Sequence, residues 1–465
     1  MTLSKAPSRL VFITSLLILS LARAPGAEGN WPQWRGADQT GASANANPPT
    51  EWSESKNVLW KVRIPGEGSA TPAIWGEKVF VVTAVNTGKK MEGAVEPAPS
   101  APPPPDRRPG GPGGPRGGRP GGGGGMGGPK PTEIHQFTVM CLDRATGRVL
   151  WQKVAREEVP HEGHHQSDGS FAPCSPVTDG KNVFAYFGSR GLFCYDFDGN
   201  LKWQKDLGKM QIKMAFGEGS SPVLWKNTLV INRDHEGGSF IVALDKETGK
   251  ELWRTAREEE TAWSTPVVVE HEGKAQVVTT ATKKIRSYDL ATGKMIWECM
   301  GLTPNVIPSP VAGNGMVYAI SGFRGNSLMA IKLGRTGDLT ETDAIAWRHN
   351  KATPYVPSPL LYQNKLYFLS NNNGVLSCFN ALDGKPYYSE ERLADISGIY
   401  ASPVGAGGRV YLVGRDGSTV VIKNSDKLEI LATNRLGDKI DASPAVAGRQ
   451  LFLRGKEYLY CLAEK

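Results

Sequence analysis

A histidine-rich segment is the first place in this chain where side chains could do chemistry. Residues 161–165 read His-Glu-Gly-His-His, and Asp168 follows closely. The letters match His-Glu-x-x-His, which binds zinc on a helix because residues four apart share a face. Pro160 and Gly163 oppose a helix, so we predict a loop. Such a loop can hold a metal ion or a ligand, or simply be solvated and hydrogen-bonded. The candidate ligands are His161, His164, His165 and Asp168.

Basic side chains recur in short polar connections between apolar segments. Guanidinium groups suit planar carboxylate, sulfate or phosphate. Asp234 and His235 directly follow Arg233 and share its connection. We therefore predict an anionic or polyhydroxylated ligand, with turns that are merely polar as the alternative. The basic residues are Arg190, Arg233, Lys283, Lys284, Arg324, Arg415, Arg454 and Lys456.

The elements that must position these residues belong to a repeat. Residues 239–253 read as an apolar strand, a Thr-Gly turn and a second strand, and Gly249 suits the turn because it takes φ > 0 without cost. Copies with the same spacing end at Trp151 and Trp297, and weaker copies end at Trp203, Trp347 and Tyr388. Tryptophan is large enough to pack into a neighbouring unit. We assign this structural docking role to Trp60, Trp151, Trp203, Trp253, Trp297 and Trp347.

Eight Ser/Thr-Pro pairs divide the chain into eight units, each with four predicted strands. Four strands per unit of this length predict an all-β fold, an eight-bladed β-propeller. The last unit lacks its fourth strand, whereas residues 57–64 form a strand without a unit. We therefore expect residues 57–465 to form a ring that the N-terminal strand closes, which leaves few open edges.

Propeller geometry brings the candidates to one face. Connections between blades emerge there together with the loops between second and third strands, so the histidine loop and the basic loops should converge in a basic funnel. Trp263, Tyr400 and Asp441 stand two residues before their Ser/Thr-Pro pairs, near the axis. An aromatic side chain there can support a flat ligand or fill the channel. His271 lies in a turn that we expect on the far face.

The regions outside the repeats carry other expectations. Residues 1–27, with Lys5 and Arg9 before an apolar run, predict a signal peptide and hence a periplasmic or extracellular protein. Residues 28–56 are expected to lie as an arm on the domain surface. No second long apolar run follows, so we predict no transmembrane segment, and we expect a monomer. The six cysteines occupy slots that other repeats fill with small residues, which indicates buried free thiols rather than disulfides.

An insert at residues 92–132 is rich in glycine, proline and arginine, and we expect it to be disordered. An arginine-glycine segment can contact nucleic acid or an anionic polymer. A tolerated loop expansion is the simpler interpretation, so no nucleic-acid partner is expected.

The hairpin at Ala243–Trp253 resembles the tryptophan-docking motif of the pyrroloquinoline-quinone (PQQ) repeat superfamily. The likeness covers essentially the whole chain after residue 57. This superfamily includes quinoprotein alcohol dehydrogenases and the propeller lipoprotein scaffold of the outer-membrane β-barrel assembly machinery. Residues 31–36, Trp-Pro-Gln-Trp-Arg-Gly, are similar to the start of exported planctomycete-type members. The resemblance implies the fold strongly and function weakly, because propellers host many functions.

Departures from these relatives leave the function open. The chain has no adjacent cysteine pair, no Cys-x-x-Cys-His and no cysteine for a lipid anchor after the apolar run. We carry over no catalytic residue. The favoured hypothesis is an exported, non-catalytic propeller, a binding or scaffold protein whose basic face binds a protein, anionic or glycan partner. The alternatives are a PQQ- and Ca²⁺-dependent oxidoreductase of alcohols or sugars, for which the resemblance alone suggests cofactors, and metal-dependent hydrolysis at the histidine loop.

Overall fold

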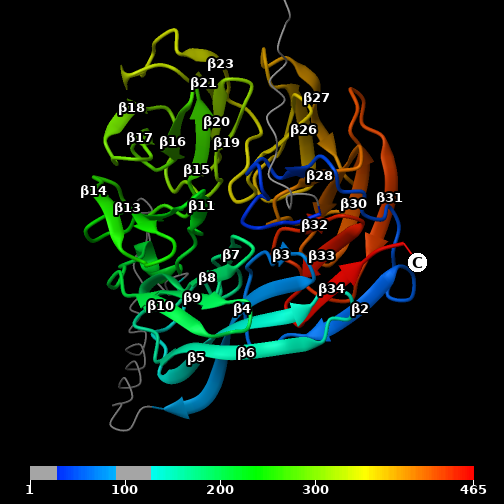
Figure 1. Ribbon diagram of the computed structural model, residues 1–465. Coiled ribbons are helices and arrows are strands. Elements are labelled where there is room, and N and C mark those ends of the chain that lie inside the picture. The colour runs from blue at the N-terminus through cyan, green and yellow to red at the C-terminus, as the bar shows by residue number, and fades with distance from the viewer. Residues whose placement is uncertain (1–28, 91–126, 465) are drawn as a thin grey trace, which may run out of the picture.

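The computed structural model describes residues 29–90 and 127–464 and contains eight sheets arranged around an axis (Figure 1). Each sheet has four antiparallel strands, and two of the sheets carry a short fifth strand. The predicted eight-bladed β-propeller is confirmed. The predicted signal peptide and most of the predicted insert lie outside the described residues. Within the described part, no helix has the length and apolar character needed to cross a membrane.

The first four blades follow the chain in order. Blade 1 contains β3 (Ala73–Trp75), β4 (Lys78–Lys90), β5 (Glu133–Asp143) and β6 (Val149–Glu158). Blade 2 contains β7 (Val177–Thr178), β8 (Asn182–Tyr186), β9 (Leu192–Asp196) and β10 (Leu201–Lys205). Blade 3 contains β11 (Val223–Trp225), β12 (Thr228–Arg233), β13 (Phe240–Asp245) and β14 (Glu251–Ala256). Blade 4 contains β15 (Val267–His271), β16 (Lys274–Thr279), β17 (Ile285–Asp289) and β18 (Met295–Cys299), with β22 (Gly337–Asp338) on its edge.

The last four blades repeat the pattern. Blade 5 contains β19 (Val311–Gly313), β20 (Met316–Ser321), β21 (Ser327–Lys332) and β23 (Ile345–His349). Blade 6 contains β24 (Leu360–Tyr362), β25 (Lys365–Leu369), β26 (Val375–Asn380) and β27 (Pro386–Arg392). Blade 7 contains β28 (Val404–Ala406), β29 (Arg409–Val413), β30 (Ser418–Lys423) and β31 (Ile430–Arg435), with β1 (Ala42–Ser43) paired in parallel to β28. Blade 8 contains β32 (Ala445–Ala447), β33 (Gln450–Arg454), β34 (Tyr458–Leu462) and the N-terminal β2 (Val58–Arg63), which closes the ring as predicted.

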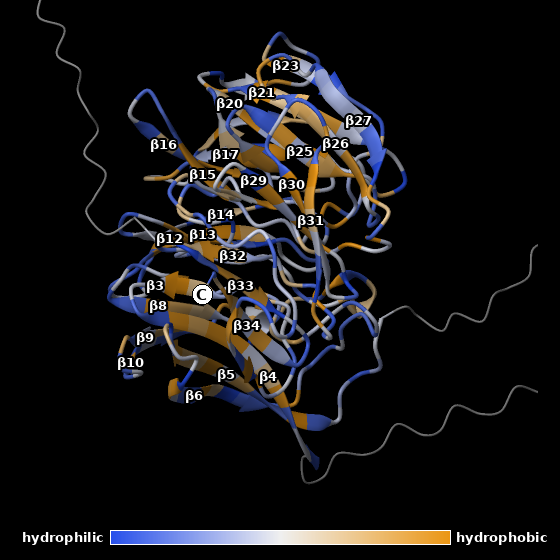
Figure 2. Cartoon of the chain, turned by 90° about the vertical axis from the view of Figure 1, so that its right-hand side faces the viewer, coloured by the Kyte–Doolittle hydropathy of each residue, from blue (hydrophilic) through white to orange (hydrophobic). Residues whose placement is uncertain are grey.

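Hydrophobic packing lies between the blades. Middle strands such as β5 and β33 are coloured hydrophobic in Figure 2, whereas outer strands such as β6 are largely hydrophilic. All six cysteines are free and buried. Two short 3-10 helices, η1 (Gly188–Arg190) and η2 (Lys213–Ala215), lie in the connections.

The repeated tryptophans join neighbouring blades. Trp203 of blade 2 donates its indole N–H to the carbonyl of Lys246 in blade 3, at 3.0 Å. Gly249 in the same turn has φ +68°, and a Cβ there would lie 2.7 Å from the Trp203 ring. Glycine is therefore required both by the turn and by the ring packed on it. Equivalent bonds to the next blade are made by Trp60, Trp151, Trp253 and Trp347. Trp297 differs, because it bonds Gln276 of its own blade.

The Ser/Thr-Pro pairs build a hydrogen-bonded ring around the axis. In blade after blade, the backbone N–H of the Ser or Thr donates to the side-chain oxygen of its counterpart in the next blade, as from Ser175 to Ser221 at 2.9 Å. Seven such bonds run from Thr71 to Ser443. The hydroxyl of Thr71 then donates to the carbonyl of Ser443 and closes the circle. Seven of the eight hydroxyls thus satisfy a buried N–H that would otherwise lack a partner.

The N-terminal arm does not rest on the surface as predicted. Trp31 pairs with Ile74 in blade 1, and Arg35 donates to the carbonyls of Pro359 in blade 6 and Pro403 in blade 7. Trp31, Gln33 and Arg35 are buried. The prediction was wrong because this polar segment provides donors and acceptors that the first strands of the blades need.

Candidate functional site

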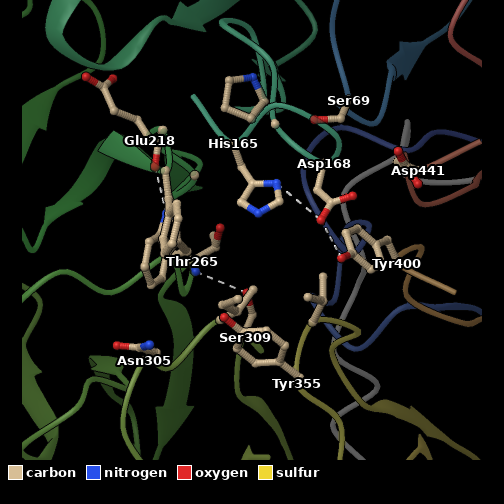
Figure 3. Close-up of a pocket in the computed structure, with 18 of the residues that line it drawn as sticks. Ser69, His165, Asp168, Glu218, Thr265, Asn305, Ser309, Tyr355, Tyr400 and Asp441 are labelled. Atoms are coloured by element: carbon tan, nitrogen blue, oxygen red, sulfur yellow. Dashed lines mark hydrogen bonds and ion pairs between the residues drawn. The ribbon is translucent and has the colours of Figure 1, made fainter. Parts of the chain in front are cut away.

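A cavity of about 970 Å³ lies on the axis of the propeller and is lined from all eight blades. It reaches the Ser/Thr ring, because seven of the eight ring residues line it. Figure 3 shows His165, Asp168 and Tyr400 on one side, with Thr265, Ser309 and Asn305 on the other. A volume of this size lies at the upper end of the range for small-molecule sites, about 300–1,000 Å³.

One wall of the cavity is a polar network centred on Arg415. Its guanidinium donates to Asp168 at 2.8 Å and makes a two-pronged contact with Asp441 at 2.6 and 3.0 Å. It also lies 4.0 Å from the centre of the Tyr400 ring, whose hydroxyl donates to Asp168 at 2.8 Å. Nδ1 of His165 is 3.3 Å from the same carboxylate. Residues from three separate blade connections and one loop therefore form a single wall.

Burial and pairing set the ionisation of this wall. Burial alone would raise the pKa of Asp168, but hydrogen bonds from Tyr400 and Arg415 outweigh it and lower that pKa. Burial, together with Asp168, raises the pKa of the Tyr400 hydroxyl. The pKa of Arg415 is raised because its contacts with Asp441 outweigh the cost of burial. Near neutral pH Asp168 is thus a carboxylate, Arg415 a guanidinium and Tyr400 a neutral phenol.

Aromatic side chains complete the lining. Trp263 donates its indole N–H to the carbonyl of Gly217 at 2.7 Å, which fixes the ring at the wall. Tyr355 stacks on Phe323 with ring centres 4.9 Å apart. Both are half-buried and face the cavity together with Phe216. Flat apolar surfaces therefore lie beside carboxylates and hydroxyls.

The structure brings together seven of the residues singled out from the sequence, six in the lining of the cavity and one behind it. The six that line the cavity are His165, Asp168, Trp263, Arg324, Tyr400 and Asp441. Arg415 stands directly behind them through its contacts with both aspartates. Arg324 is exposed and lies over the Phe323 ring, with 5.2 Å between them.

The other candidate arginines do not form the predicted basic funnel. Arg233 is buried and donates to the Tyr186 hydroxyl and the carbonyl of Gly208. Arg190 is buried against the carboxylate of Glu218 at 3.2 Å. These cations lie inside because the Tyr186 hydroxyl and groups of a blade connection offer the acceptors that a buried guanidinium requires. Arg454 is likewise buried.

Asp234 and His235 are also internal rather than at the rim. Asp234 forms a fully buried two-pronged ion pair with Arg257, at 2.7 and 2.8 Å. The ring nitrogen Nδ1 of His235 accepts backbone N–H groups of Gln211 and Gly237. Burial, followed by the charge of Arg233, lowers the pKa of His235. Both side chains have structural partners.

The three histidines of the predicted loop have different partners. Nε2 of His161 contacts the carbonyl of Met210 at 2.7 Å. The ring of His164 packs edge-on against Phe171, 4.5 Å away. His165 alone reaches the cavity. The loop is also held from outside, because Gly128 at the end of the insert donates to the carbonyl of His164.

Sequence reasoning missed several contributors to the cavity. The Ser/Thr ring was visible as a pattern, but only its prolines received a structural reason. Glu218 accepts bonds from Ser189 and Arg190, and Tyr355 stacks on Phe323. Neither residue type recurs at the matching position of the other blades. Trp34 enters from the arm and donates to the Ser309 hydroxyl at 3.2 Å. The regular Ser/Thr spacing was the one available signal for the ring.

The cavity does not fit PQQ with Ca²⁺. Calcium takes about six to eight oxygen ligands, but Asp168 and Asp441 hold Arg415, and Glu218 holds Arg190. Across residues 29–90 and 127–464, no group of three or more His, Cys, Asp or Glu side chains is placed to hold a metal ion. PQQ carries three carboxylates, whereas the lining cations are Lys213 and Arg324. The lining therefore offers neither the free oxygen ligands that Ca²⁺ needs nor enough cations for the three carboxylates of PQQ.

Comparisons with known proteins agree with the fold. Residues 135–342 match the family model described as outer membrane protein assembly factor BamB. No curated protein matches the sequence significantly. The resemblance to PQQ-repeat propellers that the hairpins predict is confirmed.

Solved structures of similar shape share little sequence. A europium-containing methanol dehydrogenase is 11% identical with a TM-score of 0.57, over 94% of this chain and 98% of that one. Quinohemoprotein alcohol dehydrogenase from Comamonas testosteroni is 11% identical with a TM-score of 0.59, over 94% and 81%. BamB from Moraxella catarrhalis is 13% identical with a TM-score of 0.49, over 70% and 93%. At 11% identity, the likeness to the two dehydrogenases shows the fold alone.

Proposed function

We propose that the protein is an exported, non-catalytic propeller that binds a neutral polyhydroxylated ligand, such as the sugar units of a glycan, in the axial cavity. The observation that carries this proposal is the lining itself. Aromatic rings of Trp263, Tyr355 and Tyr400 lie beside carboxylates and the hydroxyls of the Ser/Thr ring. Sugars present apolar C–H faces that pack on aromatic rings and hydroxyls that need polar partners.

The charge balance favours a neutral ligand over an anion. The lining contains the carboxylates of Asp168, Glu218 and Asp441. Against them stand Lys213 and Arg324 in the lining and Arg415 behind it. Lys213 is 3.5 Å from Glu260, so its charge is shared. The site therefore lacks the excess of positive charge that an anionic ligand would favour.

The hydrogen bonds that Asp168 and Asp441 already make within the wall support binding rather than catalysis. Asp168 and Asp441 each accept bonds from Arg415, and Asp168 also accepts the Tyr400 hydroxyl. These carboxylates are held rigidly and keep lone pairs for ligand hydroxyls. Such preorganisation lowers the cost of binding.

A glycan array with neutral and acidic members tests the proposal, followed by calorimetry with soluble oligosaccharides. We expect binding to neutral members, and Trp263→Ala should weaken it roughly tenfold, the loss expected when one stacked aromatic is removed. Trp225→Ala is the matched control, because Trp225 is half-buried on β11 and does not line the cavity. Binding only to acidic glycans, or equal losses in both variants, would contradict the proposal. A quinone absorbance change on adding PQQ and Ca²⁺ would instead favour the oxidoreductase.

A further inference from the structure

The wall of the axial cavity is continuous. It is lined from Ser69 in blade 1 through Ser443 in blade 8, with every blade contributing. The Ser/Thr ring links each blade to the next and closes from Thr71 back to Ser443. A ligand cannot leave sideways between blades without breaking this ring.

The floor of the cavity is the N-terminal arm. The side-chain oxygen of Gln33 accepts the N–H of Leu224 in blade 3, whereas Arg35 donates to the carbonyl of Pro403 in blade 7. These blades lie opposite each other in a ring of eight, so the arm crosses the axis. Trp34 lies between these two anchors, lines the cavity and donates to Ser309. The channel is therefore closed at this end.

Anchoring of the arm makes this floor a fixed part of the fold. Arg35 is 2% exposed, and its guanidinium bonds the carbonyls of Pro359 and Pro403 at 2.6 and 2.7 Å. Gln39 accepts the N–H of Val268 in blade 4, and Asn47 donates to the carbonyl of Gly448 in blade 8. With Trp31 in blade 1 and Trp34 in blade 5, the arm has bonds around the whole ring.

A cavity with a closed wall and a closed floor has one mouth. An internal unit of an oligosaccharide is bonded to a neighbour on both sides, so a site that holds it must be open in two directions. A terminal unit is bonded on one side only and fits a site with a single opening. We propose that this cavity binds the end of a neutral oligosaccharide and excludes chain interiors and cyclic glycans. This inference rests on the proposed function. Trp34 is then a specificity-determining residue, because its ring sets the depth at which the terminal unit stops.

The polar wall fits this role. Asp168, Tyr400 and Asp441 stand on one side of the cavity, above the ring that bears Ser309 (Figure 3). A terminal sugar unit has one more free hydroxyl than an internal unit, and a carboxylate held by Arg415 can accept it. The end of the chain is thus distinguished by shape and by hydrogen bonding.

Linear and cyclic glucans of the same linkage test the inference with the full-length mature protein. Calorimetry compares maltoheptaose with β-cyclodextrin, and linear with cyclic β-1,2-glucan. We expect binding of a linear glucan at least tenfold tighter than its cyclic counterpart. If a linear glucan and its cyclic counterpart bind with equal affinity, end recognition is overturned and the proposed function still stands. Failure of all four probes to bind overturns the proposed function and this inference with it.

Substitutions of Trp34, in the floor of the cavity, give a second test. Trp34→Ala should weaken the linear glucan about tenfold, while Trp225→Ala should leave it unchanged. Trp34→Phe keeps a ring and loses only the bond to Ser309, so binding should persist even if Trp34→Ala folds poorly. Loss of binding in Trp225→Ala, or unchanged binding in Trp34→Ala with normal folding, contradicts a floor contact.

Discussion

The buried ion pair between Asp234 and Arg257 should stabilise the fold without touching the ligand. Both side chains are fully buried, and the guanidinium meets both carboxylate oxygens. Arg257 also donates to the hydroxyls of Thr279 at 2.8 Å and Tyr288 at 2.6 Å. Burial disfavours the charge of Arg257, but Asp234 outweighs this and raises its pKa. The pair is therefore the clearest case where the structure replaces a predicted ligand contact with a structural role.

Asp234→Asn keeps the shape and removes the negative charge, which leaves Arg257 buried without a counter-charge. Breaking a buried pair from one side costs about 3–5 kcal/mol. Asparagine retains one acceptor, so we expect a loss of about 3 kcal/mol in the free energy of unfolding. Because domains are stable by only about 5–15 kcal/mol, this loss is easily measured.

Equilibrium unfolding in urea, followed by tryptophan fluorescence and by circular dichroism, measures this loss. The control is the double variant Asp234→Leu with Arg257→Met, which removes both charges. No charge is then left buried, so its loss reports only the partners that remain unpaired, the Tyr288 hydroxyl and the Asn232 side-chain amide, at about 1 kcal/mol or more each. A loss below about 1 kcal/mol in Asp234→Asn would show that the pair contributes no more than a surface ion pair. Weakened glycan binding in an Asp234→Asn variant of unchanged stability would also contradict the structural role, because it would place Asp234 in contact with the ligand.

Two further predictions concern the turns and pH. Gly249→Ala should destabilise the protein by about 1–3 kcal/mol more than Gly273→Ala, because both have positive φ but only the first meets a ring, that of Trp203. Equal urea midpoints would argue against docking at this turn. His235 accepts two backbone N–H groups and has a lowered pKa, so its contribution is present above about pH 6.5 and is lost as pH falls through the folded pKa. His235→Asn should flatten the fall in stability between about pH 7 and 5, and an unchanged slope would contradict this.

The ring architecture could be predicted because the repeat carries its own restraints. Trp203 and Gly249 show why. Only glycine suits the positive φ of the turn, and the Trp203 ring fills the space that a Cβ at Gly249 would occupy. The matching incomplete ends predicted closure by β2, and a strand must find a partner edge. These requirements are local or fall at fixed intervals, so they leave a periodic trace in the sequence.

The site could be predicted only in part, because side-chain direction in loops has no period. Asp168, Tyr400, Arg415 and Asp441 do come together, since propeller geometry sends their loops to one face. Arg233 comes from the same class of loop yet turns inward to Tyr186, and nothing in its neighbouring residues indicates that choice.

The sequence by itself therefore determined the fold, the number of blades and the face on which loops gather. The tertiary structure alone decided which charges are exposed, because a buried carbonyl or carboxylate attracts a guanidinium from a distant segment. It also decided that Trp34, far from every repeat, forms the floor of the cavity. A residue placed by one unique long-range contact leaves no pattern along the chain, whereas a residue type placed by the same contact in blade after blade does.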